Sequence, residues 1–282
     1  MTNQLEVALG RGALYEALAL GFRPPTEEMV TRLLNEQYNQ DLSEIAEMVD
    51  EKVTASTALP ALVRNWRACP DARDIETLAS SYHYYFGHTA HSNIPLYETE
   101  YGEDTLFQQP QQLGDIAGFY GAFGLTVNLS EHERVDQVSC ECEFMAFLGR
   151  KEAYAIELND SVMVEETSKA QKLFLKDHLG RFIPSFTKLL MRESPKGFYG
   201  QLARFFYEFV AQDCARFGVP AGPEQLRLRP IEVADDCFAC GGGQDVIRDL
   251  SDAAPGCEIS NHPDKLINIS TKKCIASNTN RD

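Results

Sequence analysis

Apolar residues along this chain recur mainly at the three- and four-residue intervals of an α-helix, and no useful length alternates like a β-strand. We therefore predict an all-α protein, a helical bundle of about ten helices with a long ordered loop and an irregular C-terminal tail. Thr26 favours an N-cap, with Glu27 and Glu28 in the first turn of the helix that follows. The other predicted helices span about residues 5–22, 42–53, 59–66, 75–86, 115–123, 133–157, 165–178, 180–191 and 195–217.

The predicted helix at 133–157 is apolar on two faces, which is typical of a helix surrounded by other helices. One face carries Val135, Val138, Cys142, Met145, Ala146 and Gly149. The roughly opposite face carries Cys140, Phe144, Phe147 and Leu148. Ser130 and Glu133 form a capping-box pattern that would start this helix. Its acidic residues Asp136, Glu141 and Glu143 lie in narrow strips between the faces, so they are candidates for a functional surface at the edge of the core.

Two stretches break the helical pattern. Residues 87–113 are rich in Gly, Pro, Ser and Asn, yet their aromatic and aliphatic side chains indicate an ordered, packed loop. Residues 219–282 contain few apolar side chains and cannot build a core alone. We therefore predict one helical domain at 1–218, with a turn or hinge near 158–164, followed by an irregular cysteine-containing tail at 219–282.

The net charge of −16, from 42 acidic and 26 basic residues, excludes nucleic acid as an expected partner, because no basic patch is concentrated anywhere. Charged residues interrupt the N-terminal apolar run, and no basic leader precedes it, so we expect no signal peptide. No uncharged apolar segment is long enough for stable membrane insertion. We expect a cytoplasmic protein whose eight cysteines are reduced thiols or metal ligands.

The tail places Cys237, Cys240, Cys257 and Cys274 at a spacing of C-x2-C-x16-C-x16-C, with three glycines after the second cysteine. Four thiolates fit zinc or an iron–sulfur cluster, and a metal could order a segment that has no core. The spacing is neither a zinc ribbon nor a ferredoxin run, so a tail with free thiols stays open as the alternative. His262 is a further candidate ligand.

No other group of residues predicts catalysis. Cys140 and Cys142 would point to nearly opposite sides of a helix, which favours core packing over shared metal binding. His83, His88 and His91 straddle a predicted helix end and a loop without a known ligand pattern. P-loop, dinucleotide-binding and HExxH motifs are absent, and no nucleophile–base arrangement stands out. We therefore predict that the protein is not an enzyme.

Two motifs resemble those of the TorD/DmsD/NarJ family of chaperones dedicated to molybdenum oxidoreductases. The first is Pro95-Leu-Tyr97-Glu98-Thr-Glu-Tyr101, and the second runs from Glu133 through Asp136, Gln137, Glu141 and Glu143 to Phe144-Met145. Residues 13–28 and 172–186 are similar to two further family segments, so the resemblance covers about residues 5–217. Gln137 departs from the family pattern, which has histidine there; glutamine keeps the hydrogen bonding and loses the proton switch.

The resemblance implies a chaperone that binds the precursor of a molybdopterin oxidoreductase catalytic subunit, often at a twin-arginine signal peptide, and assists cofactor insertion. An acidic surface would pair with the arginines, and aromatic residues would contact the apolar run. The client-binding residues so predicted are Tyr15, Tyr97, Glu98, Tyr101, Asp136, Gln137 and Glu141. The chaperone domain itself would need no cofactor, while contact with a guanine nucleotide or the molybdenum cofactor is left open.

The alternative interpretation is a small iron–sulfur or zinc protein that transfers electrons or metal through the tail cysteines. A cluster on those thiolates would give visible charge-transfer absorption, whereas the chaperone interpretation requires none.

Overall fold

The computed structural model describes residues 2–50, 58–87, 92–102, 108–127 and 134–229 of the 282-residue chain. All of them belong to one compact unit, which ends at Pro230. The α-helices in this part of the chain are α1 (Thr2–Gly21), α2 (Glu27–Leu34), α3 (Glu36–Val49), α4 (Leu59–Arg67), α5 (Ile75–Phe86), α6 (Gln108–Ala122), α7 (Val138–Glu157), α8 (Ser161–Asp177), α9 (Leu179–Glu193) and α10 (Phe198–Arg216). Two short 3-10 helices, η1 (Pro70–Arg73) and η2 (Glu98–Glu100), complete the elements, so the all-α prediction is confirmed.

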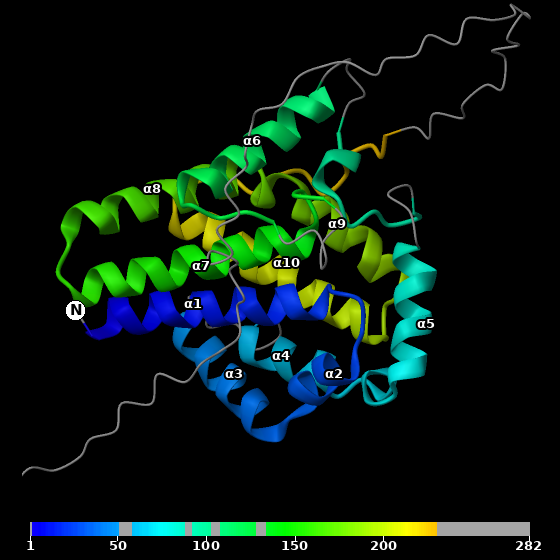
Figure 1. Cartoon of the computed structure of the whole chain (residues 1–282). Helices are drawn as coiled ribbons and strands as arrows, with labels where there is room; N and C mark the ends of the chain where they lie inside the picture. The colour runs from blue at the N-terminus through cyan, green and yellow to red at the C-terminus, as the bar shows by residue number, and fades with distance from the viewer. Residues whose placement is uncertain (1, 51–57, 88–91, 103–107, 128–133, 230–282) are drawn as a thin grey trace, which may run out of the picture. The chain divides into compact units, whose positions relative to one another are not determined.

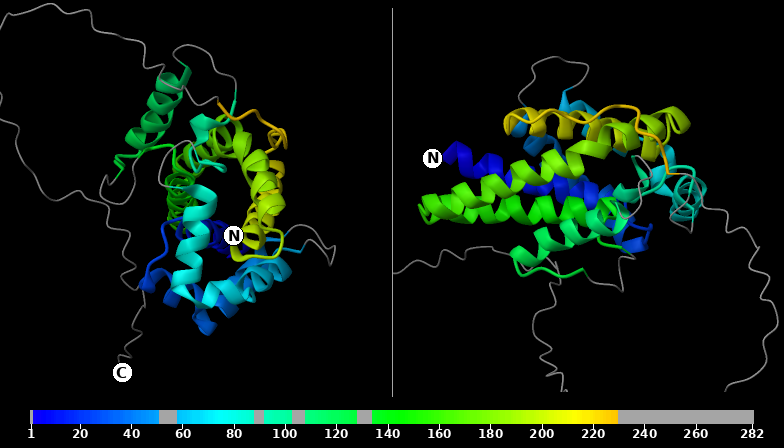
Figure 2. Two further views of the ribbon diagram at one scale, coloured as in Figure 1. Left: turned by 90° about the vertical axis from the view of Figure 1, so that its right-hand side faces the viewer. Right: turned by 90° about the horizontal axis from the view of Figure 1, so that it is seen from above.

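Helix α7 packs along α1 on one side and against α8 on another (Figure 1). The two backbones of α1 and α7 approach closely because both carry glycine at the crossing. A Cβ on Gly149 would lie 3.0 Å from both the Ala8 carbonyl oxygen and the Gly12 nitrogen. The surrounding helices α3, α4, α9 and α10 close the core, as two further views show (Figure 2).

Both apolar faces predicted for the central helix are buried in the structure. Val138, Cys142 and Met145 contribute to the core on one side, and Phe144 lies 4.8 Å from the Phe174 ring on the other, measured between centroids. Cys140 is also buried, and both cysteines are free thiols, so their predicted role as core residues is confirmed. The sequence pattern therefore correctly predicted a helix that is surrounded by other helices.

Several predicted helix boundaries were wrong. Helix α7 begins at Val138 rather than near 133, since Gln137 forms an isolated antiparallel bridge with Tyr97. The capping pair Ser130 and Glu133 lies outside the described residues. Helix α3 spans 36–49 rather than 42–53, because the Asn35 side chain caps it by accepting from the Tyr38 nitrogen.

Helix α6 begins at Gln108 within the stretch predicted to be irregular up to residue 113, and its Pro110 falls in the first turn, where proline is tolerated. Helix α10 begins at Phe198 rather than at Pro195. Its first turn is capped from a distance, because the Phe198 nitrogen donates to the Asp71 carboxylate at 2.9 Å. The Thr26 cap of α2 is confirmed, with the Met29 nitrogen 3.1 Å from its hydroxyl oxygen.

The region predicted as a turn or hinge is a tight reversal between α7 and α8. Asn159 has a left-handed backbone with φ of 56°, and the Asp160 side chain accepts from the Met163 nitrogen to start α8. After α10, the chain continues as an extended segment, residues 219–229, that lies along α9. Its Gly222 nitrogen donates to the Gly180 oxygen and its Leu226 nitrogen to the Ser185 hydroxyl.

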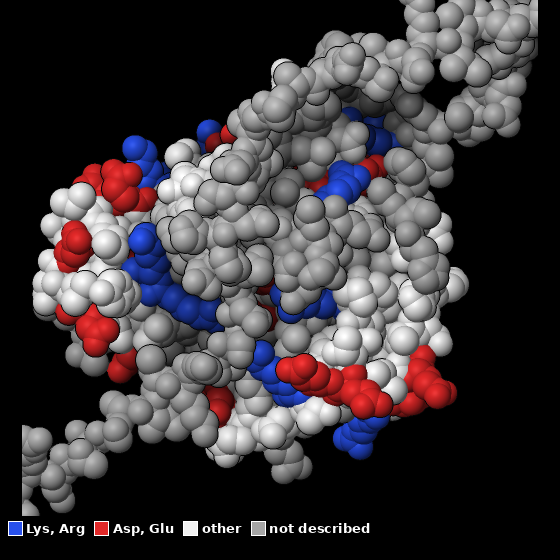
Figure 3. Space-filling view, viewed as in Figure 1, with Lys and Arg blue, Asp and Glu red and all other residues white. Residues whose placement is uncertain are grey.

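Among the helices described, none is both long enough and apolar enough to span a membrane. On the face shown in Figure 3, acidic and basic side chains of the described residues are interspersed rather than gathered in one patch of a single sign.

Gly200 in α10 provides a sharp test of the packing between α9 and α10. A Cβ there would lie 1.5 Å from the Ser194 carbonyl oxygen, so Gly200→Ala must displace the backbone. We expect the free energy of unfolding to fall by roughly 3 kcal/mol, measured by urea denaturation. The control is Gly118→Ala on the exposed face of α6, where a Cβ meets nothing within 4 Å. That variant should be neutral or slightly stabilising; equal losses in both variants would contradict the packing argument.

Candidate functional site

The two family-like motifs meet in the structure. Residues 92–102 form an irregular segment, hereafter the 92–102 loop, whose backbone pairs with the residues just before α7. The Glu98 nitrogen donates to the Asp136 oxygen at 2.9 Å, and the Val138 nitrogen donates to the Leu96 oxygen at 2.8 Å. Tyr101 closes the loop from within, because its hydroxyl donates to the Pro95 oxygen at 2.8 Å. Six of the seven predicted client-binding residues are thereby brought together: Tyr97, Glu98, Tyr101, Asp136, Gln137 and Glu141.

Four acidic side chains converge at this contact: Glu98, Glu100, Asp136 and Glu141. Together with Arg134, Arg181 and His178 they form a cluster that we call the carboxylate junction. On one side, Arg134 donates two parallel hydrogen bonds to the Asp136 carboxylate, from Nε at 2.9 Å and from a terminal nitrogen at 2.8 Å. Arg134 also donates to Glu100 at 3.1 Å and to the Thr99 hydroxyl. Its guanidinium carbon lies 4.5 Å from the centre of the Tyr97 ring, a cation–π distance.

On the other side, Glu98 receives its donors from α9 and its N-terminal cap. Arg181 donates to one Glu98 oxygen from Nε at 3.2 Å and from a terminal nitrogen at 2.7 Å. The His178 Nδ1 atom lies 3.1 Å from the second oxygen. The His178 Nε2 atom lies 3.2 Å from the Asp115 carboxylate without hydrogen-bond geometry. Glu98 therefore ties the loop directly to α9.

Glu141 is the one junction carboxyl that no arginine holds. It is fully buried, and neither of its oxygens has a nitrogen donor among the described residues. Burial raises the pKa of Glu141 well above its ordinary value, and the neighbouring Glu98 and Asp136 carboxylates raise it further. A proton on Glu141 would remove its repulsion from these two carboxylates. The surroundings of Glu141 therefore favour its neutral form.

The sequence predicted that Glu98, Asp136 and Glu141 would form an exposed acidic surface, and in that respect the prediction was wrong. All three side chains are 0% exposed. The physical reason is that Asp136 and Glu98 are each paired with an arginine inside the domain, while Glu141 lies on the buried face of α7 between them. Tyr97, Tyr101 and Gln137 are also buried. Whether they contact a client stays a prediction.

Tyr15 lies in a different cluster. Its hydroxyl donates to Asp213 at 2.8 Å, and Arg11 grips the same carboxylate at 2.6 and 2.8 Å, joining α1 to α10. Arg11 also contacts Glu152 of α7 at 3.3 Å. Burial raises the pKa of Tyr15, and the Asp213 charge raises it further, so the tyrosine stays protonated. The structure thus separates Tyr15 from the other six residues.

Sequence reasoning missed Arg134, Arg181 and His178 as partners of these acids. Each lies inside a segment that carried the family resemblance, Arg134 beside Asp136 and the other two within 172–186. The signal was available in principle, since buried acids need basic or donor partners and each of these three residues can supply one.

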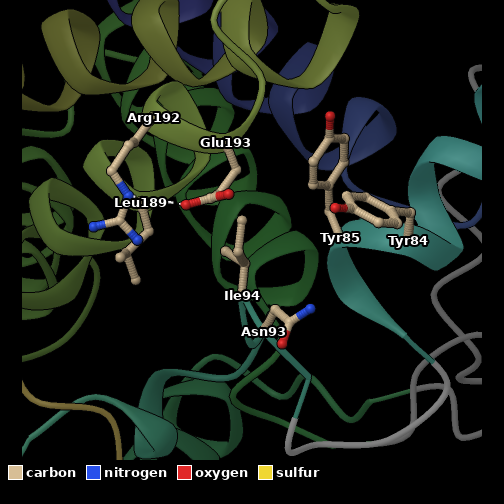
Figure 4. Close-up of a pocket in the computed structure, with 7 residues that line it drawn as sticks. All are labelled: Tyr84, Tyr85, Asn93, Ile94, Leu189, Arg192 and Glu193. Atoms are coloured by element: carbon tan, nitrogen blue, oxygen red, sulfur yellow. Dashed lines mark hydrogen bonds and ion pairs between the residues drawn. The ribbon is translucent and has the colours of Figure 1, made fainter.

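A pocket of about 300 Å³ opens beside the start of the 92–102 loop (Figure 4). Helix α5 contributes Tyr84 and Tyr85, the loop contributes Asn93 and Ile94, and the end of α9 contributes the other lining residues, Leu189, Arg192 and Glu193. The backbone of Ile94 is fixed by a bond from its nitrogen to the Tyr85 oxygen. One loop therefore borders the pocket at one end and the carboxylate junction at the other.

Within the described part of the chain, no three His, Cys, Asp or Glu side chains are arranged to hold a metal ion. Cys237, Cys240, Cys257, Cys274 and His262 all lie outside the described residues, as do His88 and His91. The metal site predicted in the tail therefore stays a prediction.

Comparison with known proteins decides the family. Residues 33–188, which include the 92–102 loop and the junction, match the family described as nitrate reductase delta subunit. The chain belongs to this family. The matched region ends before the cysteine-bearing tail begins.

Two relatives carry informative names. The perchlorate reductase assembly chaperone protein of Dechloromonas aromatica (strain RCB) is 27% identical over 195 residues, which are 65% of this chain and 79% of that protein. The chlorate reductase assembly chaperone protein of Ideonella dechloratans is 31% identical over 131 residues, 45% of this chain and 63% of that protein. The prediction of a redox-enzyme maturation chaperone, rather than an enzyme, is confirmed by the family and these relatives. They give no support to the alternative of an iron–sulfur or zinc transfer protein.

The protonated Glu141 predicts a pH-dependent stability. In the unfolded chain Glu141 ionises near its ordinary pKa of 4.5, whereas the folded domain raises that pKa. The stability that this proton contributes is complete below the unfolded value and is lost as the pH rises toward the folded one. Glu141→Gln replaces this carboxyl by a group of similar shape that cannot ionise. We expect its melting temperature to exceed that of the natural protein by about 2–4 °C at pH 8.

The same difference should shrink toward zero near pH 4.5. Glu157→Gln, on the exposed end of α7, removes the same formal charge and should show no such pH-dependent gap. A Glu141→Gln protein that is less stable than the natural one at pH 8 would contradict a neutral Glu141.

Proposed function

We propose that this protein is a cytoplasmic chaperone for the catalytic subunit of a molybdopterin-containing oxidoreductase. It would bind the precursor, hold it until the cofactor is inserted, and release it before export. The observation that carries this proposal is membership of the nitrate reductase delta subunit family over residues 33–188, with relatives named as assembly chaperones of perchlorate and chlorate reductases.

We assign client recognition to the carboxylate junction and the 92–102 loop. A twin-arginine leader presents two guanidinium groups followed by an apolar run. The junction concentrates acids next to the aromatic ring of Tyr97, which is the environment that a guanidinium prefers. The pocket of Tyr85, Ile94 and Leu189 borders the same loop and offers aromatic and aliphatic surface to a neighbouring side chain of the client.

Affinity capture of the full-length protein from its native host, under anaerobic conditions, tests the proposal. We expect the catalytic subunit of a molybdopterin enzyme to copurify, with its leader uncleaved, and a deletion strain to accumulate that subunit without cofactor. Assay of the same eluates for molybdopterin and guanine nucleotide addresses the two contacts that the sequence leaves open. Recovery of no such subunit, together with normal enzyme maturation in the deletion strain, would refute the proposal.

A matched pair of variants locates the client site. Asp136→Asn removes the charge at the junction, and Asp213→Asn removes an equally buried, arginine-paired carboxylate in the Tyr15 cluster. We expect Asp136→Asn to reduce captured client about tenfold, because charge-assisted bonds to arginine are lost. Asp213→Asn should retain the client at a comparable melting temperature. Equal losses in both would assign the effect to stability and remove Asp136 from the site.

A further inference from the structure

On its side of the junction, Arg134 fills a site made of two carboxylates, a hydroxyl and an aromatic ring. Its Nε and one terminal nitrogen fork onto the two oxygens of Asp136 at 2.9 and 2.8 Å, and its other terminal nitrogen reaches Glu100 at 3.1 Å. The Thr99 hydroxyl accepts a further bond, and the Tyr97 ring stacks on the guanidinium carbon at 4.5 Å. A planar fork, a second carboxylate and an aromatic face together match the recognition of arginine rather than lysine.

Arg134 is also the outermost member of this arrangement. Its side chain is 23% exposed, whereas Asp136 and Glu100 beneath it are 0% and 3% exposed. Arg134 is therefore the most exposed of these three side chains.

The frame of the site does not depend on Arg134. Asp136 keeps bonds from the Thr99 nitrogen at 3.1 Å and the Thr99 hydroxyl at 2.8 Å, and its backbone oxygen still accepts from Glu98. Arg181 differs in this respect, since it also donates to the backbone oxygen of Tyr101 and so supports the loop itself. Of the two junction arginines, Arg134 is the one that can leave its site with the loop still bonded to the residues before α7.

We propose that Arg134 is a built-in competitor for a guanidinium-binding site, which an arginine of the client must displace. This inference rests on the proposed function for its client and names the regulation of that same site. While Arg134 fills the site, an arginine of the client cannot bind there. The apparent affinity for the client is therefore reduced in proportion to the fraction of molecules whose site is open. The competitor would reject segments that lack arginine, because only a second guanidinium replaces all of the lost contacts.

Binding of synthetic peptides to the full-length protein tests the competition. The probe is a peptide with two adjacent arginines followed by an apolar run, and the comparison peptide has lysines in their place. We expect Arg134→Ala to bind the arginine peptide about tenfold more tightly than the natural protein does, by isothermal calorimetry. Its affinity for the lysine peptide should change less than twofold.

The matched control is Arg32→Ala. Arg32 is also paired with a carboxylate, that of Glu16, and lies 5.4 Å over the Tyr38 ring, but it is in α2, outside the junction. Its removal changes the net charge equally and should leave both affinities unchanged. Arg134→Gln, which keeps a side-chain donor, serves as the second variant if Arg134→Ala does not fold. A folded Arg134 variant with weaker or unchanged affinity for the arginine peptide overturns the competition.

A second measurement does not depend on the client. Ethylguanidine at millimolar concentration should raise the melting temperature of the Arg134 variants by refilling the site, whereas ethylamine should not. The natural protein and Arg32→Ala should respond to neither compound. If no protein binds the peptides, the leader part of the proposed function fails, and rescue by ethylguanidine still supports the guanidinium site; absence of rescue overturns it.

Discussion

Two backbone hydrogen bonds, from Glu98 to Asp136 and from Val138 to Leu96, position the segments that form the carboxylate junction. They join the 92–102 loop to the residues that precede α7, although about forty residues of sequence separate Glu98 from Asp136. This pairing brings Thr99 against Asp136, and Glu98 of the same loop reaches Arg181 and His178 of α9 and its cap. Without it, the acids would be dispersed along two segments and each would need water as its partner.

Burial of the carboxylate junction costs desolvation free energy, but its pairing specifies one arrangement of the loop. Burying several carboxylates is unfavourable unless each receives donors, and a buried ion pair is often no more stabilising than apolar packing. The structure meets the requirement with two arginines, a histidine and one retained proton. Such an arrangement fixes one register for the loop, since a shift by a single residue would leave Asp136 or Glu98 without its partners. The Arg11–Asp213 pair plays the corresponding part between α1 and α10.

The fold was largely predictable, because local periodicity and burial agree in most helices. The two apolar faces of α7 and the Thr26 cap are examples in which the sequence pattern alone suffices. The start of α10 was not predictable, because its cap comes from Asp71, far away along the chain. The grouping of the site residues was implied by the family motifs, whereas their burial was not. Burial depended on Arg134 and Arg181, whose pairing with these acids requires the tertiary structure, and the separation of Tyr15 depended on Asp213 in the same way.

The extended segment after α10 has a mechanical consequence. It ends beside the 92–102 loop, where the Gly102 nitrogen donates to the Arg227 oxygen and the Arg229 nitrogen donates to the Glu100 oxygen. Glu100 is also an acceptor for Arg134. Residues 227–229 are therefore tethered, through one short antiparallel contact, to the backbone of a junction residue. A pull on the backbone at residue 229 would load those two hydrogen bonds first and would pass directly to the 92–102 loop.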